Sequence, residues 1–392
     1  MTRYFDYAAT TPTDPRVVEE MLPYYTEHFG NPNSLYTIGR DAYKALENAR
    51  ERIAEPLGAK PEEIIFTSGG TESDNAALVS TLWRLAPEGG AHIITSAYEH
   101  HAILEVVEWL GKHGHEISIV KPRKDGHVAA DDIEAAMRPN TKVVSVIMAN
   151  NEIGSINDIA TIAQIAHEGG ALMHTDAVQA LGKIEIDVEA LGIDMLSMSA
   201  HKIYGPRGIG ALYLRRGTRF DPLIKGGGQE SRRRSGTQNV VGAVGFAKAL
   251  EIIVAEMDSE AARLSALRDF LIDEVTSRLE NTLATVESDP RLPNIVPLLV
   301  KGVEGEAMLL QLDNLGFSVS TGSACSSGSL EASHVLLSIG VPQEIAHGSL
   351  RLSMGRWTTK EDCVELVDAL IPIVERLREM SPVYKRMFCG EG

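Results

Sequence analysis

The chain has 392 residues, a length that predicts two domains, because single hydrophobic cores rarely grow beyond about 250–300 residues. Its composition, 44% hydrophobic and 23% charged, is that of an ordinary globular protein and excludes a fibrous or disordered chain. The formal net charge of −17 argues against partners such as nucleic acids or anionic membranes, since both would repel it.

Cysteine usage points to a reducing compartment. The three cysteines, Cys325, Cys363 and Cys389, are odd in number and far apart, which is typical neither of a disulfide framework nor of a zinc site. The N-terminal stretch has no apolar segment like that of a signal peptide, and no run approaches the ~20 apolar residues of a membrane helix. We therefore expect a cytoplasmic protein that binds no metal and no membrane. The basic run 232–234 fits a solvated loop and an anion site equally well.

The first two thirds of the chain have the pattern of an α/β domain with a mostly parallel sheet. Short apolar runs alternate with helical patterns from about residue 60 to residue 215. The predicted strands are 64–67, 92–96, 116–120, 143–149, 171–175, 195–199 and 209–214. Residues 100–110 and 159–167 have apolar positions three and four apart and are predicted helices.

The pattern changes near Ser259. A long amphipathic helix is predicted over 259–280, followed by short strands around Pro293 and Pro297 and a last helix over 359–380. We therefore predict two domains. A large α/β domain spans 15–258, and a smaller α+β domain combines 1–14 with 259–392, so the extended N-terminal segment is expected to pack against the C-terminal part.

A glycine-rich turn joins the strand predicted at 64–67 to a helix that starts near Thr71. Backbone N–H groups at such a helix start, with a hydroxyl beside them, can bind a phosphate. Gly-rich turns of this kind are common, and a tight turn with Thr71 as the N-cap explains the pattern equally well.

Two further residues make the phosphate interpretation more specific. Asp176 ends an apolar strand, where open α/β sheets bind their ligands, and Lys202 follows another strand in a turn that can desolvate its amine. A phosphate anchor, a carboxylate for a ring nitrogen and a Schiff-base amine are what a pyridoxal phosphate site requires. The G-x-G-x-x-G pattern of a nicotinamide site is absent.

Eleven motifs, in order along the chain, carry a family resemblance. They are YAATTP (7–12), GNPNS (30–34), TSGGTESDN (67–75), EH (99–100), NNEIG (150–154), HTDAVQ (174–179), SAHKIYG (199–205), GGGQE (226–230), RSGT (234–237), GSACSS (322–327) and RLSMG (351–355). Over essentially its whole length the chain resembles the group I cysteine desulfurases, the NifS/IscS-like branch of the fold-type I pyridoxal phosphate enzymes in the class V aminotransferase superfamily.

The resemblance implies a role for each matching residue at the cofactor. Lys202 would form the Schiff base, Asp176 would pair with the ring nitrogen, and Gln179 would hydrogen-bond the ring hydroxyl. Asn151 would lie near that hydroxyl and the substrate. The phosphate would be held by residues from several motifs: Gly70, Thr71, Ser199, His201 and, from the second subunit of a homodimer, Thr237.

The resemblance also implies a reaction. Arg351 would bind the carboxylate of L-cysteine, His100 would stack on the cofactor and transfer protons, and Cys325 would take up the substrate sulfur as a persulfide while alanine leaves. The Ser/Gly-rich loop of about 318–332 would let Cys325 travel, and we expect it to be mobile. Cys363 and Cys389 are expected to be structural or incidental. An iron–sulfur scaffold protein is the expected sulfur acceptor, with carriers for tRNA thiolation or cofactor synthesis still open.

Three positions depart from the family pattern. Gly70 stands where alanine is usual, Tyr36 where histidine is frequent, and Arg232 where glycine is common.

Two other classes of function also remain. A selenocysteine lyase or another class V aminotransferase or lyase would share Asp176 and Lys202, although an aminotransferase would not need Cys325. A non-catalytic scaffold of the same fold would need none of Lys202, Asp176 and Cys325.

Overall fold

The computed structural model describes residues 3–286, 289–322 and 332–389. Its largest sheet has seven strands in the order β2-β8-β7-β6-β5-β3-β4. The strands are β2 (Ile64–Thr67), β3 (His92–Ser96), β4 (Glu116–Val120), β5 (Thr141–Ser145), β6 (Leu172–Asp176), β7 (Met195–Ser199) and β8 (Gly210–Leu214). Only β8 runs antiparallel to its neighbours, so the predicted mostly parallel α/β sheet is confirmed.

Helices cover both faces of this sheet because its strands are apolar on both faces. Ile93 packs on the side of α4 (Gly70–Asn75), α5 (Thr81–Leu85) and α6 (His101–Lys112), whereas Ile94 packs on the opposite side. That opposite side is covered by α3 (Thr37–Ala54), α7 (Ala130–Ala136), α8 (Ile159–Glu168) and the first half of α10 (Val240–Arg278). Residues next to each other in a strand therefore belong to different cores.

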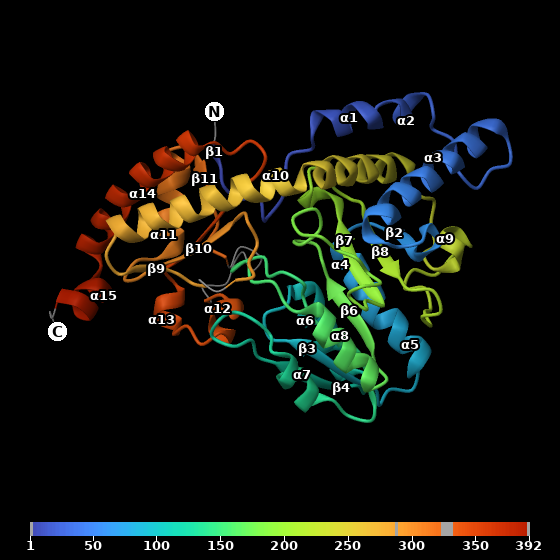
Figure 1. Ribbon diagram of the computed structural model, residues 1–392, viewed down its shortest axis with the longest axis horizontal. Coiled ribbons are helices and arrows are strands. Elements are labelled where there is room, and N and C mark those ends of the chain that lie inside the picture. Colours follow the sequence, from blue (N-terminus) through green and yellow to red (C-terminus); the bar gives the residue numbers. More distant parts are fainter. Residues whose placement is uncertain (1–2, 287–288, 323–331, 390–392) are drawn as a thin grey trace.

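A smaller sheet of three antiparallel strands lies in the other lobe of the molecule (Figure 1). Its order is β12 (Ser349–Ser353), β10 (Ile295–Val300) and β9 (Thr282–Ala284). The second half of α10, α11 (Gly305–Asn314) and α14 (Lys360–Met380) share its core. At the N-terminal side, β1 (Arg3–Tyr4) pairs in parallel with β11 (Phe317–Ser318), and Asp6 bridges to Ser353.

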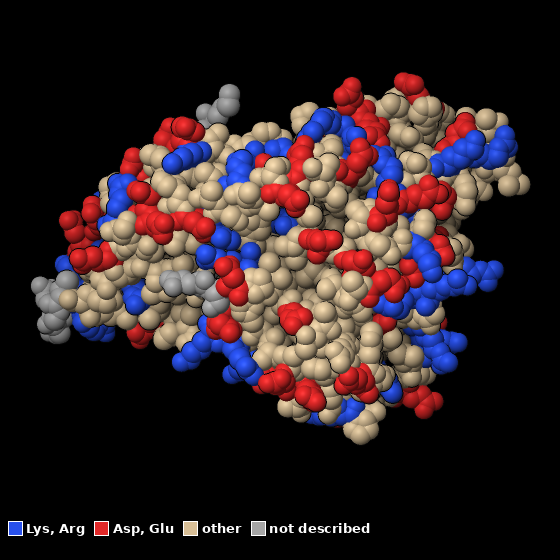
Figure 2. Space-filling view, viewed as in Figure 1, with Lys and Arg blue, Asp and Glu red and all other residues tan. Residues whose placement is uncertain are grey.

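The described part of the chain also contains short α-helices. They are α1 (Pro15–Met21), α2 (Pro23–Thr26), α9 (Gln229–Arg232), α12 (His334–Ser338), α13 (Gln343–Ala346) and α15 (Pro382–Tyr384). None of the helices within the described ranges is long and apolar enough to cross a membrane. On the face seen in Figure 2, acidic and basic side chains are interspersed rather than gathered into fields of one sign.

Helix α10 differs most from the prediction. It has 39 residues and begins at Val240, whereas the sequence pattern predicts a helix only from 259. Residues 240–250 are apolar apart from Lys248 and mostly buried, with Ala243 and Phe246 in the core of the large sheet, so this part lacks the alternating faces that mark a helix. Its second half, with Leu264 and Leu271, joins the core of the small sheet. The boundary predicted at 258/259 therefore falls inside one helix, and the division into two domains stays a proposal.

Candidate active site

A cavity of about 330 Å³ opens at the carboxyl ends of β6 and β7. Its lining comes from segments far apart in the sequence: the stretch after β1, the start of α4, the residue before α6, the turns after β5, β6 and β7, and β12. Ten of the predicted site residues line it: Gly70, Thr71, His100, Asn151, Asp176, Gln179, Ser199, His201, Lys202 and Arg351.

The amine of Lys202 is held at the wall of this cavity by the N-terminal segment. Its Nζ donates hydrogen bonds to the carbonyl oxygens of Ala8 at 2.6 Å and Ala9 at 2.8 Å. The side-chain amide of Gln179 donates to the same Ala8 carbonyl at 2.8 Å. Ala8 and Ala9 belong to the motif YAATTP, so one role of that motif is to position the amine of Lys202.

Asp176 is the last residue of β6 and lies almost completely buried. Its Oδ1 accepts a hydrogen bond from the Val178 N–H at 2.8 Å. Burial raises the pKa of Asp176 to about 6, against the opposing effects of that hydrogen bond and of Lys202. A buried carboxylate stays ionised most readily beside a cation, and a protonated ring nitrogen would be such a partner.

The opposite end of the cavity is lined by small and hydroxyl-bearing residues. Gly70 and Thr71 open α4, and Gly69 rather than Thr71 is the N-cap, so the alternative with Thr71 as N-cap is wrong. A Cβ at Gly70 would lie 2.7 Å from the Val178 side chain, so an alanine at this position would require that side chain to shift. His201 hydrogen-bonds the Thr10 hydroxyl through Nδ1 at 3.0 Å, and burial, aided by Lys202, lowers its pKa to about 4.

His100 precedes α6 and caps it. Its Nδ1 accepts a hydrogen bond from the Ala102 N–H at 3.1 Å. Burial, with Lys202 as the next cause, lowers the pKa of His100 to about 4, so the ring is neutral near pH 7. Because Nδ1 accepts, the neutral ring carries its proton on Nε2. His100 therefore offers one N–H donor from the cavity wall.

Arg351 comes from β12 of the small sheet and reaches the cavity from the other side. Its Nη2 pairs with Asp6 Oδ1 at 2.8 Å, and its Nη1 donates to the carbonyl oxygen of Asn151 at 3.0 Å. Its Nε is buried and has no hydrogen-bond partner among the described residues. The backbone N–H of Arg351 donates to the carbonyl of Ser320 at 2.7 Å. The backbone of Arg351 thus pairs with Ser320, while its guanidinium lies between Asp6 and Asn151.

Two predicted site residues are not among the described residues that line this cavity. Thr237 is exposed on the surface of the chain and does not line it. Cys325, with the mobility predicted for its loop, lies outside the described residues. Cys363 is fully buried in α14, and burial raises the pKa of its thiol to about 12, which makes it unreactive. Cys389 ends the short helix Lys385–Cys389.

Unpaired polar atoms test whether the cavity fits pyridoxal phosphate. Gln179 Oε1 and Asp74 Oδ1 are buried in the cavity lining and have no hydrogen-bond partner within the described ranges. A cofactor with a ring hydroxyl and a ring nitrogen can satisfy such groups, and Lys202 supplies the amine that its aldehyde requires. The residues present therefore fit the cofactor.

Sequence reasoning missed five lining residues: Ala8, Ala9, Asp74, Ile147 and Val178. Asp74 lies within the motif TSGGTESDN, but its residue type alone does not separate it from an exposed helix residue. Ala8 and Ala9 act through backbone carbonyls, which leave no trace in residue type.

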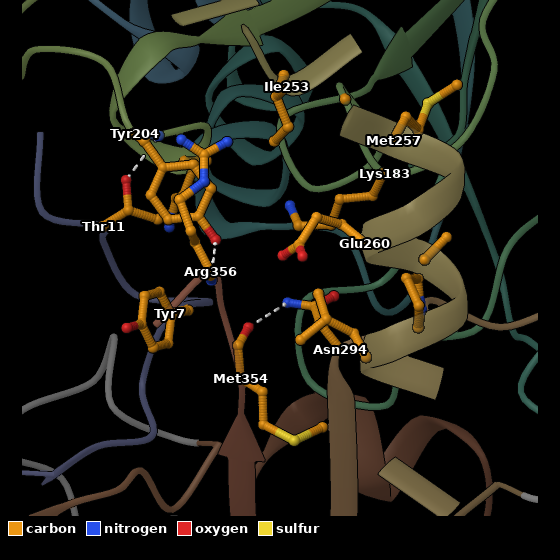
Figure 3. Close-up of a pocket in the computed structure, with 15 residues that line it drawn as sticks. Tyr7, Thr11, Lys183, Tyr204, Ile253, Met257, Glu260, Asn294, Met354 and Arg356 are labelled. Atoms are coloured by element: carbon orange, nitrogen blue, oxygen red, sulfur yellow. Dashed lines mark hydrogen bonds between the residues drawn. The ribbon is translucent and has the colours of Figure 1, made fainter. Parts of the chain in front are cut away.

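Lys202 also lines a second, much smaller cavity of about 30 Å³, shown in Figure 3. Its volume is enough for a water molecule. Lys183 reaches this cavity from the turn after Gln179, and its Nζ donates to the Gln179 carbonyl at 2.8 Å. Burial, followed by the charge of Lys202, lowers the pKa of Lys183 to about 7. Two lysines therefore share one enclosed space.

The structure shows why glycine is common at position 232, but it explains neither of the two remaining departures from the family pattern. Arg232 has φ of 67°, and the two residues before it also have positive φ, a conformation in which glycine is the easiest residue. The buried ion pair between Arg50 and Glu230, at 2.7 Å, holds this turn. Tyr36 precedes α3 on the surface and does not line the cavity, and nothing in the structure explains it.

Comparison with known proteins identifies the class. A family model described as aminotransferase class-V matches residues 3–366. The chain is 50% identical over 383 residues to Cysteine desulfurase IscS of Dictyoglomus turgidum, covering 98% of this chain and 97% of the relative. The chain belongs to the class-V aminotransferase family. It is an enzyme of that family, and the prediction of pyridoxal phosphate as its cofactor is confirmed.

Solved structures agree in fold. One described as a NifS-like protein superposes with a TM-score of 0.90 at 36% identity and covers 96% of this chain and 100% of its own. Another, described as SspA in complex with cysteine, has a TM-score of 0.81 at 34% identity and covers 91% of this chain and 100% of its own. The predicted fold of a fold-type I enzyme is therefore confirmed.

Proposed function

We propose that this chain is a cysteine desulfurase, which converts L-cysteine to L-alanine and passes the sulfur to a protein thiol. The observation that carries the proposal is the identity of 50%, over almost the whole of both chains, to a relative named Cysteine desulfurase IscS. The shared cavity of Lys202, Asp176 and Arg351 supports it, because each chemical part of the reaction has a residue of suitable type there.

Arg351 is the proposed binding group for the substrate carboxylate. A guanidinium matches a carboxylate with two parallel N–H donors, and the Nε of Arg351 has no partner among the described residues. Asp6 and the Asn151 carbonyl already fix the plane of the guanidinium, so it is oriented before the substrate arrives. Asn151 is proposed to contact the substrate and the ring hydroxyl of the cofactor.

Proton transfer is assigned to Lys202 and His100. When bound, pyridoxal phosphate supplies an electron sink for charge that develops at the substrate Cα. Lys202 is proposed as the base that takes the Cα proton, and Asp176 as the acceptor that keeps the ring nitrogen protonated. To accept a thiol proton at Nε2, His100 has to change to the tautomer protonated at Nδ1, which breaks the hydrogen bond from the Ala102 N–H, and we propose that it does so during the reaction.

Sulfur transfer is assigned to Cys325. Its thiolate would form an S–S bond with the substrate sulfur while the Cβ–S bond breaks, and protonation of the carbon left behind gives alanine. A free thiol has a pKa of about 8.5, so it needs a base to become a thiolate near neutrality. His100 is the proposed base.

The phosphate end of the cofactor is assigned to Gly70, Thr71, Ser199 and His201, with Thr237 supplied by a second subunit. Thr237 is exposed, and its neighbour Gln238 accepts a hydrogen bond from the Asn33 side chain at 2.9 Å. Large exposed apolar side chains surround Asn33 in sequence, which is typical of a subunit interface. They are Leu22, Tyr25, Phe29, Leu35, Tyr36, Ile38 and Tyr43.

The proposed homodimer is tested by sedimentation velocity with Leu35→Asp, since Leu35 is 88% exposed in the single chain. The expected result is a dimer for the parent and a monomer for the variant, with loss of bound cofactor. Ile119→Asp is the matched control, because Ile119 is 55% exposed on β4, far along the chain. A parent that sediments as a monomer would contradict the proposal.

An iron–sulfur scaffold protein is the proposed sulfur acceptor, supported by relatives named Cysteine desulfurase IscS. The test mixes the sulfur-loaded chain with a purified scaffold or with a tRNA-thiolation carrier and follows radiolabelled sulfur. Preferential transfer to the scaffold is expected.

The central experiment quantifies alanine and sulfide together after L-cysteine and a thiol reductant are added to the purified protein. Equal amounts from the parent and neither from Cys325→Ser are expected. Alanine without dependence on Cys325 would contradict the persulfide step. Conversion that depends on a keto acid would instead favour an aminotransferase, and activity restricted to selenocysteine would favour a selenocysteine lyase.

A further inference from the structure

A row of buried polar side chains lies under the cofactor cavity on the α4 face of the large sheet. In the strand register, Ser145 of β5 is opposite His174 of β6, and Asp176 of β6 is opposite Ser197 of β7. His174 and Asp176 are two residues apart on one strand, so they point to the same face. Asp74, from α4, packs over this row.

Hydrogen bonds connect the row. His174 hydrogen-bonds the Ser145 hydroxyl through Nδ1 at 2.8 Å and the Ser197 hydroxyl through Nε2 at 3.1 Å. Its Nε2 also lies 3.8 Å from Asp74 Oδ1. His174 is fully buried, and burial lowers its pKa to about 3, so the ring is neutral. Asp74 therefore has no cationic partner in His174 near pH 7.

Asp74 itself is a buried carboxyl that the proposed reaction does not use. It is 1% exposed and lines the cavity beside Asp176, and its Oδ1 has no hydrogen-bond partner in the described part of the chain. Burial, and next the charge of Asp176, raises the pKa of Asp74 well above its usual range, with a smaller contribution from Glu99 and an opposing one from the Ser197 hydroxyl.

The two carboxyls differ in what stabilises their charge. Asp176 has the Val178 N–H and the ammonium of Lys202, whereas the groups that act on Asp74 are two carboxyls and a hydroxyl. Two carboxyls that share a site do not both ionise easily, and the one with the better partners ionises first. Asp176 is therefore the member of the pair that carries the negative charge.

We propose that Asp74 is a positioning residue that stays protonated beside Asp176, so that Asp176 alone is the carboxylate for the cofactor's ring nitrogen and Asp74 is its neutral polar neighbour. The inference rests on the proposed cofactor site only for the role toward the ring nitrogen. The protonation of Asp74 is a property of the protein without ligand, and the two parts can fail separately.

The first test is infrared spectroscopy of the cofactor-free protein at pH 7, with and without ¹³C-labelled aspartate. The expected result is an isotope-sensitive band of a protonated carboxyl in the parent, lost in Asp74→Asn and retained in Asp176→Asn. Asp131→Asn, at an exposed position of α7, is the control and should retain the band. Absence of the band from the parent, or its loss only in Asp176→Asn, would overturn the proposal.

The second test follows the ring nitrogen of ¹⁵N-labelled pyridoxal phosphate by NMR as the pH is raised. Asp74→Asn should keep the parent's pH of deprotonation, because the amide is also polar and neutral. Asp74→Leu removes the polar neighbour and should lower that pH by about one unit, since a carboxylate is weakened by less polar surroundings.

The outcomes separate the two hypotheses. If Asp74 were ionised, Asp74→Asn would lower the pH of deprotonation and the proposal would fail. Identical behaviour of the Asn and Leu variants would remove the role toward the ring nitrogen. Asp176→Asn is the positive control and should lose the ring proton. Failure of the parent to bind the cofactor would contradict the proposed function while leaving the infrared result to decide the state of Asp74.

Discussion

The two larger sheets differ in what their strands bury. Near its carboxyl edge the seven-stranded sheet buries polar side chains such as Ser145, His174, Asp176 and Ser197. In the three-stranded sheet, all six residues of β10 are apolar and buried, and the one charged residue of β12 is Arg351. Buried polar groups are costly unless paired, so their concentration marks where the chemistry takes place. In the small sheet the buried polar side chains of β12 are Arg351 and its neighbours Ser349 and Ser353, beside a β10 that is apolar throughout.

The largest effect is expected at the polar sheet. Lys202→Ala removes the proposed base and should reduce alanine formation by on the order of 10²–10⁴-fold, with little change in folding. The measurement is the rate of alanine release from L-cysteine. Lys225→Ala, at an exposed lysine over Trp83, is the control and should keep the parent's rate. A Lys202→Ala enzyme with the parent's rate would remove the lysine from the mechanism.

The apolar sheet should respond in stability instead. Leu350 is fully buried in β12, and Leu350→Ala should cost about 2–5 kcal/mol because it leaves a cavity in the small core. The check is the urea midpoint of unfolding. Leu310→Ala, at a position of α11 that is 62% exposed, should change the free energy of unfolding obtained from the urea transition by less than about 0.5 kcal/mol. Equal losses for the two variants would show that the small core is not tightly packed.

Arg351 links the two regions, and its loss should affect substrate binding. Arg351→Lys keeps the charge but loses the planar pair of donors, so the KM for L-cysteine should rise about 10- to 100-fold, the equivalent of ~1.5–3 kcal/mol. Steady-state kinetics would measure it, with the exposed Arg376→Lys in α14 as control. A change in kcat alone, with KM unaltered, would argue against carboxylate binding.

The smallest effect concerns Glu99 and depends on pH. Burial raises the pKa of Glu99 to about 8 from an ordinary value of 4.5. Between these two values the folded chain holds a proton that the unfolded chain has released, so this carboxyl makes folding less favourable as the pH rises from about 4.5 to about 8. Glu99→Gln replaces this carboxyl by an amide that does not titrate, so its pH-dependent contribution to stability disappears.

The expected result is a Tm difference that shifts in favour of Glu99→Gln as the pH is raised from about 5 to about 8. The side chain of Glu99 can be replaced by an amide without loss of its backbone contact. Glu99 Oε1 accepts a hydrogen bond from the Ile147 N–H, which an amide oxygen can also accept, and Oε2 has no partner within the described ranges. Exposed Glu105→Gln should give a constant difference. A constant difference for Glu99→Gln as well would show that this carboxyl is ionised in the fold.

The sequence predicted the strands of the large sheet well because they are short apolar runs between turn residues. The ranges predicted for β2, β3, β4 and β7 agree with the structure residue for residue. The strand predicted at 143–149 was too long at its end, since the β5 ladder stops at Ser145. Helix α10 was half missed because burial on all sides removes the amphipathic pattern.

The candidate site also contains residues that the sequence predicted and residues that it did not. Motifs located the residues whose type is chemically specific, such as Lys202 and Arg351. They did not locate Asp74, since what makes it unusual is the proximity of Asp176, about a hundred positions later in the chain. Contacts of this range depend on the folded arrangement and have no local signal. The roles of Cys325 and Thr237 stay predictions.

Helix α10 has a further consequence for how insertions and deletions would be tolerated. It joins both cores without a break, and an α-helix turns by about 100° for each residue. One residue added between Phe246 and Leu264 would therefore rotate the face that packs on the small sheet by about a quarter of a turn relative to the face that packs on the large one. Length changes in this helix would be compatible with both faces only in whole turns, and even those would move Arg351 away from Lys202 by about 5.4 Å per turn.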